Sequence, residues 1–159
     1  MIEFKKFKDE DINYIFLNKI EVEEENSYHV SRGKEDNSDK LYSGKNPNSV
    51  QIFLEVASKI EDYIKKKGWN LGRANNKHYI AFKYGFPVVM GIRWLGNKSM
   101  ALFFKIPKDK VQSISVQEFP LLLYREQYDE ANYKIVNSDV DMSKFDNLFE
   151  TAYKYITGE

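Results

Sequence analysis

The side chains in this sequence most able to do chemistry are basic and aromatic, and they are interleaved between residues 73 and 105. Cations bind phosphates and aromatic rings stack on bases, so a sheet face with both is typical of single-stranded nucleic-acid binding. The residues that we expect to bind nucleic acid are Arg73, Lys77, Tyr79, Lys83, Arg93, Lys98, Phe103 and Lys105. Strand alternation predicts one shared face, opposite the core, for Lys77, Tyr79, Lys83, Arg93 and Phe103.

The charge distribution supports an anionic partner. The formal net charge is zero, yet the stretch from Lys59 to Lys110 holds twelve Lys and Arg against three Asp and Glu. Such asymmetry indicates an interaction with an anion. The alternative interpretation is a solvated surface whose acidic residues fold back against the basic ones.

Residues for catalysis or metal binding are scarce. The two histidines, His29 and His78, have no neighbouring ligand at the spacing of a metal site or a nucleophile–base pair. The acidic runs 23–25 and 126–130 could bind a hard cation but lack the pattern of a calcium loop, and acid runs are usually solvated. We therefore expect no catalytic residue, no metal and no cofactor.

Nucleotide-binding loops are also missing. Ser43-Gly44-Lys45 superficially resembles a phosphate loop, but the upstream glycine is absent and Asn46 follows the lysine. Gly91 and Gly96 are not followed by a helix, so they form no dinucleotide fingerprint.

Composition bounds the class of protein. The 159 residues suit one domain, and 42% are hydrophobic. There is no cysteine, which excludes disulfides and thiolate chemistry. The N-terminus has no apolar core of a secretion signal, and no apolar run is long enough to span a bilayer. We expect a cytoplasmic protein with no membrane partner.

The first 49 residues are predicted to form an N-terminal arm and a polar loop. Asp9 is a suitable cap for a helix whose apolar residues recur at helical spacing: Ile12, Ile15, Phe16, Leu17 and Ile20. Residues 21–49 are polar, which predicts a loop or linker. The domain proper is expected to cover residues 50–159.

The rest of the chain predicts an α+β domain. A helix capped by Asn48 or Ser49 should carry an apolar stripe and end at Gly68. The stripe consists of Phe53, Leu54, Ala57, Ile60 and Ile64. Three strands over residues 77–84, 88–95 and 99–106 should form an antiparallel meander with one buried face.

The C-terminal third is less regular. Residues 119–124 form either a strand or a buried helical turn, and Pro120 disfavours a central strand. A short strand over residues 133–136 and a helix capped by Asp141 or Ser143 complete the chain. The expected fold is an antiparallel sheet, made of a three-stranded meander plus a short strand, with two helices packed on one face.

The block Asn76-Lys77-His78-Tyr79-Ile80-Ala81-Phe82-Lys83, followed by the meander and by the closing strand and helix, resembles the DUF5655 group of small bacterial domains. That group is similar in layout to the YdhG/YjbR-like domains. The resemblance covers roughly residues 50–157. It implies a compact sheet-and-helix module that accompanies nuclease-like or restriction-like domains, and it carries no catalytic residues over to this chain.

Three functions remain open at this point. The first is a non-enzymatic binding module that contacts nucleic acid through the basic, aromatic sheet face. The second is a protein-interaction module in which residues 1–20 dock onto another protein or another copy of this chain. The third is an enzyme or small-ligand binder with dispersed residues, in a pocket lined by Trp69, Tyr79 and Trp94.

Overall fold

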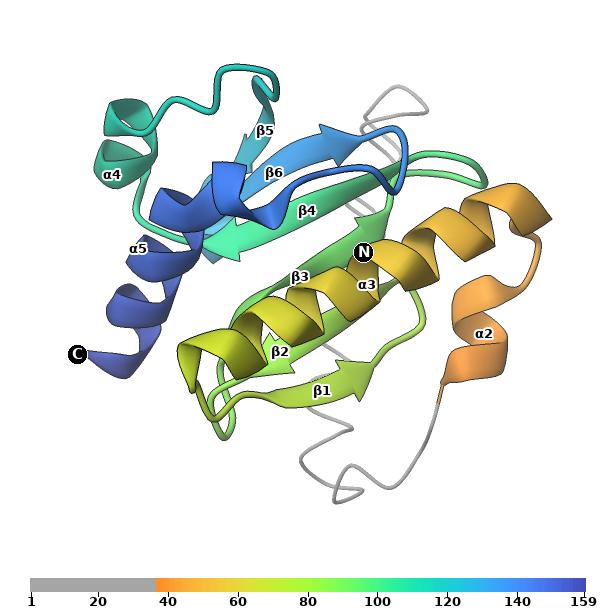
Figure 1. Ribbon diagram of the computed structural model, residues 1–159, viewed down its shortest axis with the longest axis horizontal. Helices are drawn as coiled ribbons and strands as arrows, with labels where there is room; N and C mark the ends of the chain where they lie inside the picture. The colour runs from red at the N-terminus through yellow and green to blue at the C-terminus, as the bar shows by residue number, and fades with distance from the viewer. Residues whose placement is uncertain (1–36) are drawn as a thin grey trace.

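Helix α3 (Pro47–Lys67) is the longest element and crosses one face of a sheet (Figure 1). The Asn46 side chain accepts a hydrogen bond from the Ser49 backbone N–H at 3.2 Å, and Pro47 occupies the first turn. The cap expected at Asn48 or Ser49 is therefore wrong. Proline is favoured in the first turn, where a backbone N–H would have no partner, so the helix starts earlier, at Pro47. Gly68 ends the helix in the left-handed conformation, as predicted.

The computed structural model describes residues 37–159, so the predicted helix over residues 9–20 lies outside the described part. Within the stretch predicted as a loop, residues 38–42 form helix α2 (Ser38–Tyr42), and Leu41 is completely buried in the core. The loop prediction is wrong there, since one buried leucine and the Tyr42–Phe53 ring contact anchor an otherwise polar turn.

Within residues 37–159, the sheet has six antiparallel strands in the order β1-β2-β3-β4-β6-β5. The predicted meander and the α+β class are confirmed, and strands β1 and β5 occupy the two edges. The strand bounds are β1 (Gly72–Asn75), β2 (Tyr79–Lys83), β3 (Val88–Trp94), β4 (Met100–Lys105), β5 (Leu121–Arg125) and β6 (Glu130–Ile135). Pro120 precedes an edge strand, where a missing N–H does least harm.

The remaining elements join and cover these strands. They are helix α4 (Lys108–Ser113), the short 3-10 helices η2 (Glu126–Tyr128) and η3 (Met142–Phe145), and helix α5 (Asp146–Thr157). The Asp141 side chain caps η3 by accepting from the Ser143 N–H at 3.0 Å. The cap predicted for the final helix at Asp141 or Ser143 is therefore wrong, because η3 intervenes and α5 begins after Phe145 without a side-chain cap. Helices α3 and α5 pack on the same face of the sheet, as predicted (Figure 1).

The face under α3 and α5, here called the first face, holds the main core. Phe53 of α3 stacks on Trp94 of β3 with ring centroids 4.3 Å apart, and Trp69 stacks on Tyr153 of α5 at 4.2 Å. Leu54, expected in the apolar stripe of α3, is 40% exposed, and Val56 is buried instead. The buried positions 53, 56, 57, 60 and 64 follow the i, i+3, i+4, i+7, i+11 spacing of one helix face, and position 54 lies outside it.

The opposite side of the sheet, here called the second face, is also buried over the central strands. Every residue of β2 and β3 is buried. The prediction of one buried face is therefore wrong. A register shift between Phe82 and Lys83 also moves Val88 to the second face, where it clusters with Tyr79, Ala81 and Phe103.

Candidate functional site

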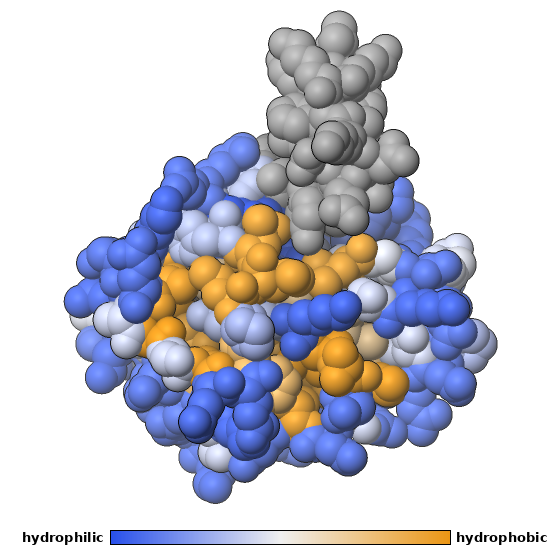
Figure 2. Space-filling model, turned by 90° about the horizontal axis from the view of Figure 1, so that it is seen from above, coloured by the Kyte–Doolittle hydropathy of each residue, from blue (hydrophilic) through white to orange (hydrophobic). Residues whose placement is uncertain are grey.

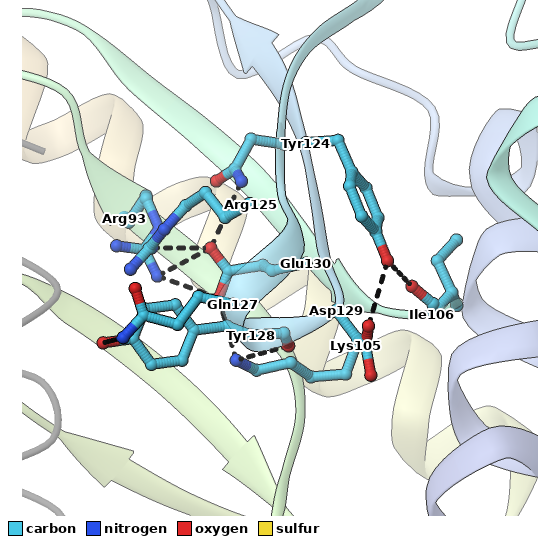
Figure 3. A network of polar contacts seen from close by, with 10 residues as sticks. Arg93, Lys105, Ile106, Tyr124, Arg125, Gln127, Tyr128, Asp129 and Glu130 are labelled. Atoms are coloured by element: carbon cyan, nitrogen blue, oxygen red, sulfur yellow. Dashed lines mark hydrogen bonds and ion pairs between the residues drawn. The ribbon is translucent and has the colours of Figure 1, made fainter. Parts of the chain in front are cut away.

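The centre of the candidate site is Glu130, a fully buried carboxylate at the start of β6. Cations from three strands contact it on the second face (Figure 3). Arg93 Nη2 lies 3.0 Å from Oε1, Lys105 Nζ lies 3.0 Å from Oε2, and Arg125 Nη1 donates to Oε1 at 2.8 Å. A carboxylate without solvent is stable as an anion only when opposite charges and hydrogen bonds replace its hydration.

The strand register brings these groups together. Arg125 and Glu130 are directly paired across β5 and β6, and Lys105 of β4 is paired with Glu130 from the other side. The tight connection through η2 ends at Asp129, a non-glycine residue with a φ of 47°. Aspartate tolerates this left-handed conformation, and its side chain accepts from Tyr155 Oη at 2.8 Å.

The electrostatics of Glu130 reflect two opposing effects. Burial by itself raises the pKa of the carboxyl, because the charged form loses its hydration. The charges of Arg93, Lys105 and Arg125 outweigh this burial and lower the pKa of Glu130 to about 2. Glu130 is therefore ionised at every physiological pH, and the cluster holds three cations around one carboxylate.

Aromatic rings flank the cations. The Arg93 guanidinium lies 4.7 Å from the ring centroid of Phe103 and 5.4 Å from that of Tyr79, and Arg125 lies 4.7 Å from the ring of Tyr128. Guanidinium groups interact favourably with the faces of such rings. The second face thus combines delocalised cations and flat rings within a few ångströms.

Gly91 makes room for this arrangement. A Cβ on Gly91 would lie 2.1 Å from the Ile80 carbonyl oxygen and 2.7 Å from the Phe103 ring. The ring can therefore lie against the sheet only because position 91 has no side chain.

Asn132 contributes an unused acceptor. Its Nδ2 donates to Glu130 Oε1 at 3.2 Å, while its buried Oδ1 meets no hydrogen-bond donor among residues 37–159. A buried acceptor of this kind is costly unless something donates to it. An occupant of the second face with N–H groups would satisfy it.

The predicted site residues divide into two groups. Tyr79, Lys83, Arg93, Phe103 and Lys105 lie together on the second face, as strand alternation requires. They are not a solvated surface, because Tyr79 and Arg93 are each 2% exposed and Phe103 is 1% exposed.

The other predicted residues do not join them. Arg73 contacts Glu61 of α3 at 3.5 Å and so belongs to the helix side. Lys77 precedes β2 and Lys98 lies in the turn between β3 and β4, both exposed. Lys77 and Lys98 lie outside the strands, so the alternation of strand side chains does not place them on either face. Arg73 lies on the first face because it pairs with Phe82 in the strand register.

Sequence reasoning missed Arg125, Glu130 and Asn132. The acidic run 126–130 was interpreted as a solvated surface and the strand was expected to start at Tyr133. A signal was present, since residues 130–135 alternate strictly between polar and apolar types. Among residues 37–159, no group of three or more acidic or histidine side chains is placed to hold a metal ion.

The pocket expected between Trp69, Tyr79 and Trp94 does not form. Tyr79 lies on the second face, whereas Trp94 stacks on Phe53 under α3 and Trp69 stacks on Tyr153. Odd and even positions of paired strands point to opposite faces, so Tyr79 and Trp94 cannot line one cavity.

A groove of about 700 Å³ lies between α3 and the segment 139–146. Two of its lining residues bond to α5: the Tyr63 hydroxyl donates to Asp146, and Lys67 Nζ lies 3.1 Å from Asp146 and 2.8 Å from Glu150. The contacts join α3 to α5. We interpret the groove as a seam between helices.

The edge strand β5 presents apolar side chains to solvent. Leu121 and Leu122 are 44% and 45% exposed, and Val136, just after β6, is 69% exposed. Figure 2 shows apolar side chains gathered between charged ones when the molecule is seen from above. An exposed apolar edge is a known route to pairing with another chain.

Comparison with known proteins gives no match to a family model, a curated protein or a solved structure. The resemblance to the DUF5655 group stays a prediction. Among the described residues, no helix has the length and apolar character to cross a bilayer.

Proposed function

We propose that the protein is a non-enzymatic binding module that holds single-stranded nucleic acid on the second face of its sheet. The observation that carries the proposal is the gathering of Arg93, Lys105 and Arg125 around one carboxylate, with aromatic rings against the guanidinium groups. Phosphates and bases need these two kinds of side chain.

An exposed lysine lies at the rim of the second face. Lys134 of β6 is exposed and pairs in register with Ala101, which pairs with Arg93, so it lies on the same face at the rim of the cluster. Phosphates of a bound strand can contact such a lysine without disturbing the buried ions. The buried Asn132 Oδ1 adds an acceptor for the amino group of a base.

Fluorescence anisotropy tests the proposal with a labelled single-stranded oligonucleotide and its duplex over a salt series. The expected result is preference for the single strand and a steep fall in affinity with salt. Lys134→Gln should weaken binding and reduce the salt slope by about 0.7, the value for one phosphate contact on a single strand. Lys154→Gln on α5 is the matched control and should leave both unchanged.

The proposal fails if neither the unaltered chain nor the double variant Ile12→Asp/Phe16→Asp binds the oligonucleotide at low salt. It also fails if Lys134→Gln and Lys154→Gln have equal effects. The proposal places the protein in the cytoplasm, where nucleic acid is present and where a chain without cysteine suits the reducing conditions.

A second candidate function, contact with another protein or another copy of this chain, is supported by the apolar edge strand β5. Residues 1–20, expected to provide such contacts, lie outside the described residues. The edge strand offers a different surface for the same kind of partner.

A further inference from the structure

The second face is suited to packing against another segment or molecule. Its apolar members, Tyr79, Ala81, Val88 and Phe103, form a cluster separate from the main core. Among residues 37–159, helices α3 and α5 lie on the first face, and the ring of Tyr79 meets that of Phe103 edge-on at 5.7 Å. An aromatic cluster on a sheet gains stability by losing contact with water.

Among the described residues, the same face carries more cations than carboxylates. Arg93, Lys105 and Arg125 outnumber Glu130, and Lys83 adds another cation beside the aromatic cluster. Its preferred occupant is therefore both apolar and acidic.

A segment of this chain has both properties. Residues 9–25 contain seven Asp and Glu against one lysine, Lys19. The same residues carry an apolar stripe at helical spacing, namely Ile12, Ile15, Phe16, Leu17 and Ile20. A helix over residues 9–20 would be about 18 Å long, which spans roughly four strands at about 4.8 Å each.

The described part of the chain begins close enough to the second face for residues 9–25 to reach it. Ser38, at the start of α2, accepts a hydrogen bond from Asn75 Nδ2 of the edge strand β1 at 3.2 Å. The eleven residues 26–36 can span up to about 35 Å when extended, whereas six strands cover a width of roughly 24 Å. Residues 9–25 can therefore lie over any strand of the second face.

We propose that residues 9–25 dock onto the second face of the chain's own sheet, with the apolar stripe over the Tyr79–Phe103 cluster and the acidic residues toward the cations. Intramolecular docking needs little intrinsic affinity, because the tether keeps the segment at a high effective concentration. The consequence for nucleic acid rests on the proposed function: the acidic segment and an oligonucleotide compete for one face, so the segment regulates access.

A thiol-protection experiment on the full chain tests the docking without nucleic acid. The chain contains no cysteine, so one introduced cysteine is the sole reporter. Ala101→Cys places it at a fully buried position of the second face, paired with Arg93, and Val136→Cys places it at an exposed position. Ala81→Cys, also fully buried on this face, is the second probe if Ala101→Cys does not fold.

The perturbation is the double variant Ile12→Asp/Phe16→Asp, which interrupts the apolar stripe. The matched control, Asn13→Asp/Asn18→Asp, adds the same charge at positions outside the stripe. The emission of Trp69 and Trp94, both stacked on other rings, reports whether the domain remains folded.

We expect the cysteine at position 101 to react with a thiol reagent at least about tenfold more slowly than the cysteine at position 136. The stripe variant should raise the labelling rate at position 101 at least about tenfold, because it removes the local closed state. The control variant should leave it unchanged. Equal rates at the two positions in the unaltered chain, or no acceleration by the stripe variant, would overturn the proposal.

Oligonucleotide binding then separates the two proposals. If both hold, the stripe variant binds the single strand more tightly than its charge-matched control. Acceleration of thiol labelling without any oligonucleotide binding would leave the docking intact and reject the proposed function. Oligonucleotide binding together with equal labelling rates at positions 101 and 136 would reject the docking and leave the proposed function intact.

Discussion

Replacing Glu130 with glutamine removes one negative charge from the centre of the second face and leaves the side-chain volume almost unchanged. Three cations then remain in a site where Arg93 is 2% exposed and Arg125 is 6% exposed. Removing one partner of a buried ion cluster costs about 3–5 kcal/mol, because buried charges lose an ionic partner without regaining hydration.

The pKa of Glu130 points in the same direction. Its decrease from the ordinary 4.5 to about 2 means that the native state favours the ionised carboxylate. For a chain of this size, a loss of about 3–5 kcal/mol predicts a melting temperature lower by roughly 10–15 °C.

Urea denaturation monitored by the fluorescence of Trp69 and Trp94 measures the change. The matched control is Glu126→Gln, since the Glu126 side chain is 68% exposed and pairs with Lys108 on the surface. Exposed ion pairs contribute about 0–1 kcal/mol, so this control should be nearly neutral. The reasoning is refuted if Glu130→Gln unfolds within about 1 kcal/mol of Glu126→Gln.

Three further predictions follow from the same geometry. Because the pKa of Glu130 is lowered, its stabilisation is complete above pH 4.5 and is lost as the pH falls toward 2; urea titrations should therefore show the unaltered chain and Glu130→Gln converging over that range. Gly91→Ala should cost at least about 2 kcal/mol, because its Cβ meets a backbone oxygen at 2.1 Å, whereas Gly72→Ala, with open space, should cost less than 1 kcal/mol; equal losses would contradict this. Leu122→Lys on the exposed edge strand should reduce concentration-dependent self-association in analytical ultracentrifugation, and an unchanged sedimentation profile would exclude that edge as the contact.

The local patterns of the sequence determined much of the fold. Alternation in the three central strands predicted the meander and the shared face of Tyr79, Arg93 and Phe103, because side chains of a strand alternate between faces regardless of what covers them. The αL glycine after α3, Gly68, was predicted for a similar reason, since a helix end is a local event. The α+β class followed from the order of these elements.

Only the tertiary structure decided which polar residues are buried. Glu130 belongs to an acidic run in sequence, yet strand pairing places it between Lys105 and Arg125, which lie 25 and 5 positions before it. No local pattern records that pairing, because it depends on which strands become neighbours in the sheet. The sequence by itself thus identified a basic, aromatic face, whereas the register converted that face into a buried ion cluster around one carboxylate.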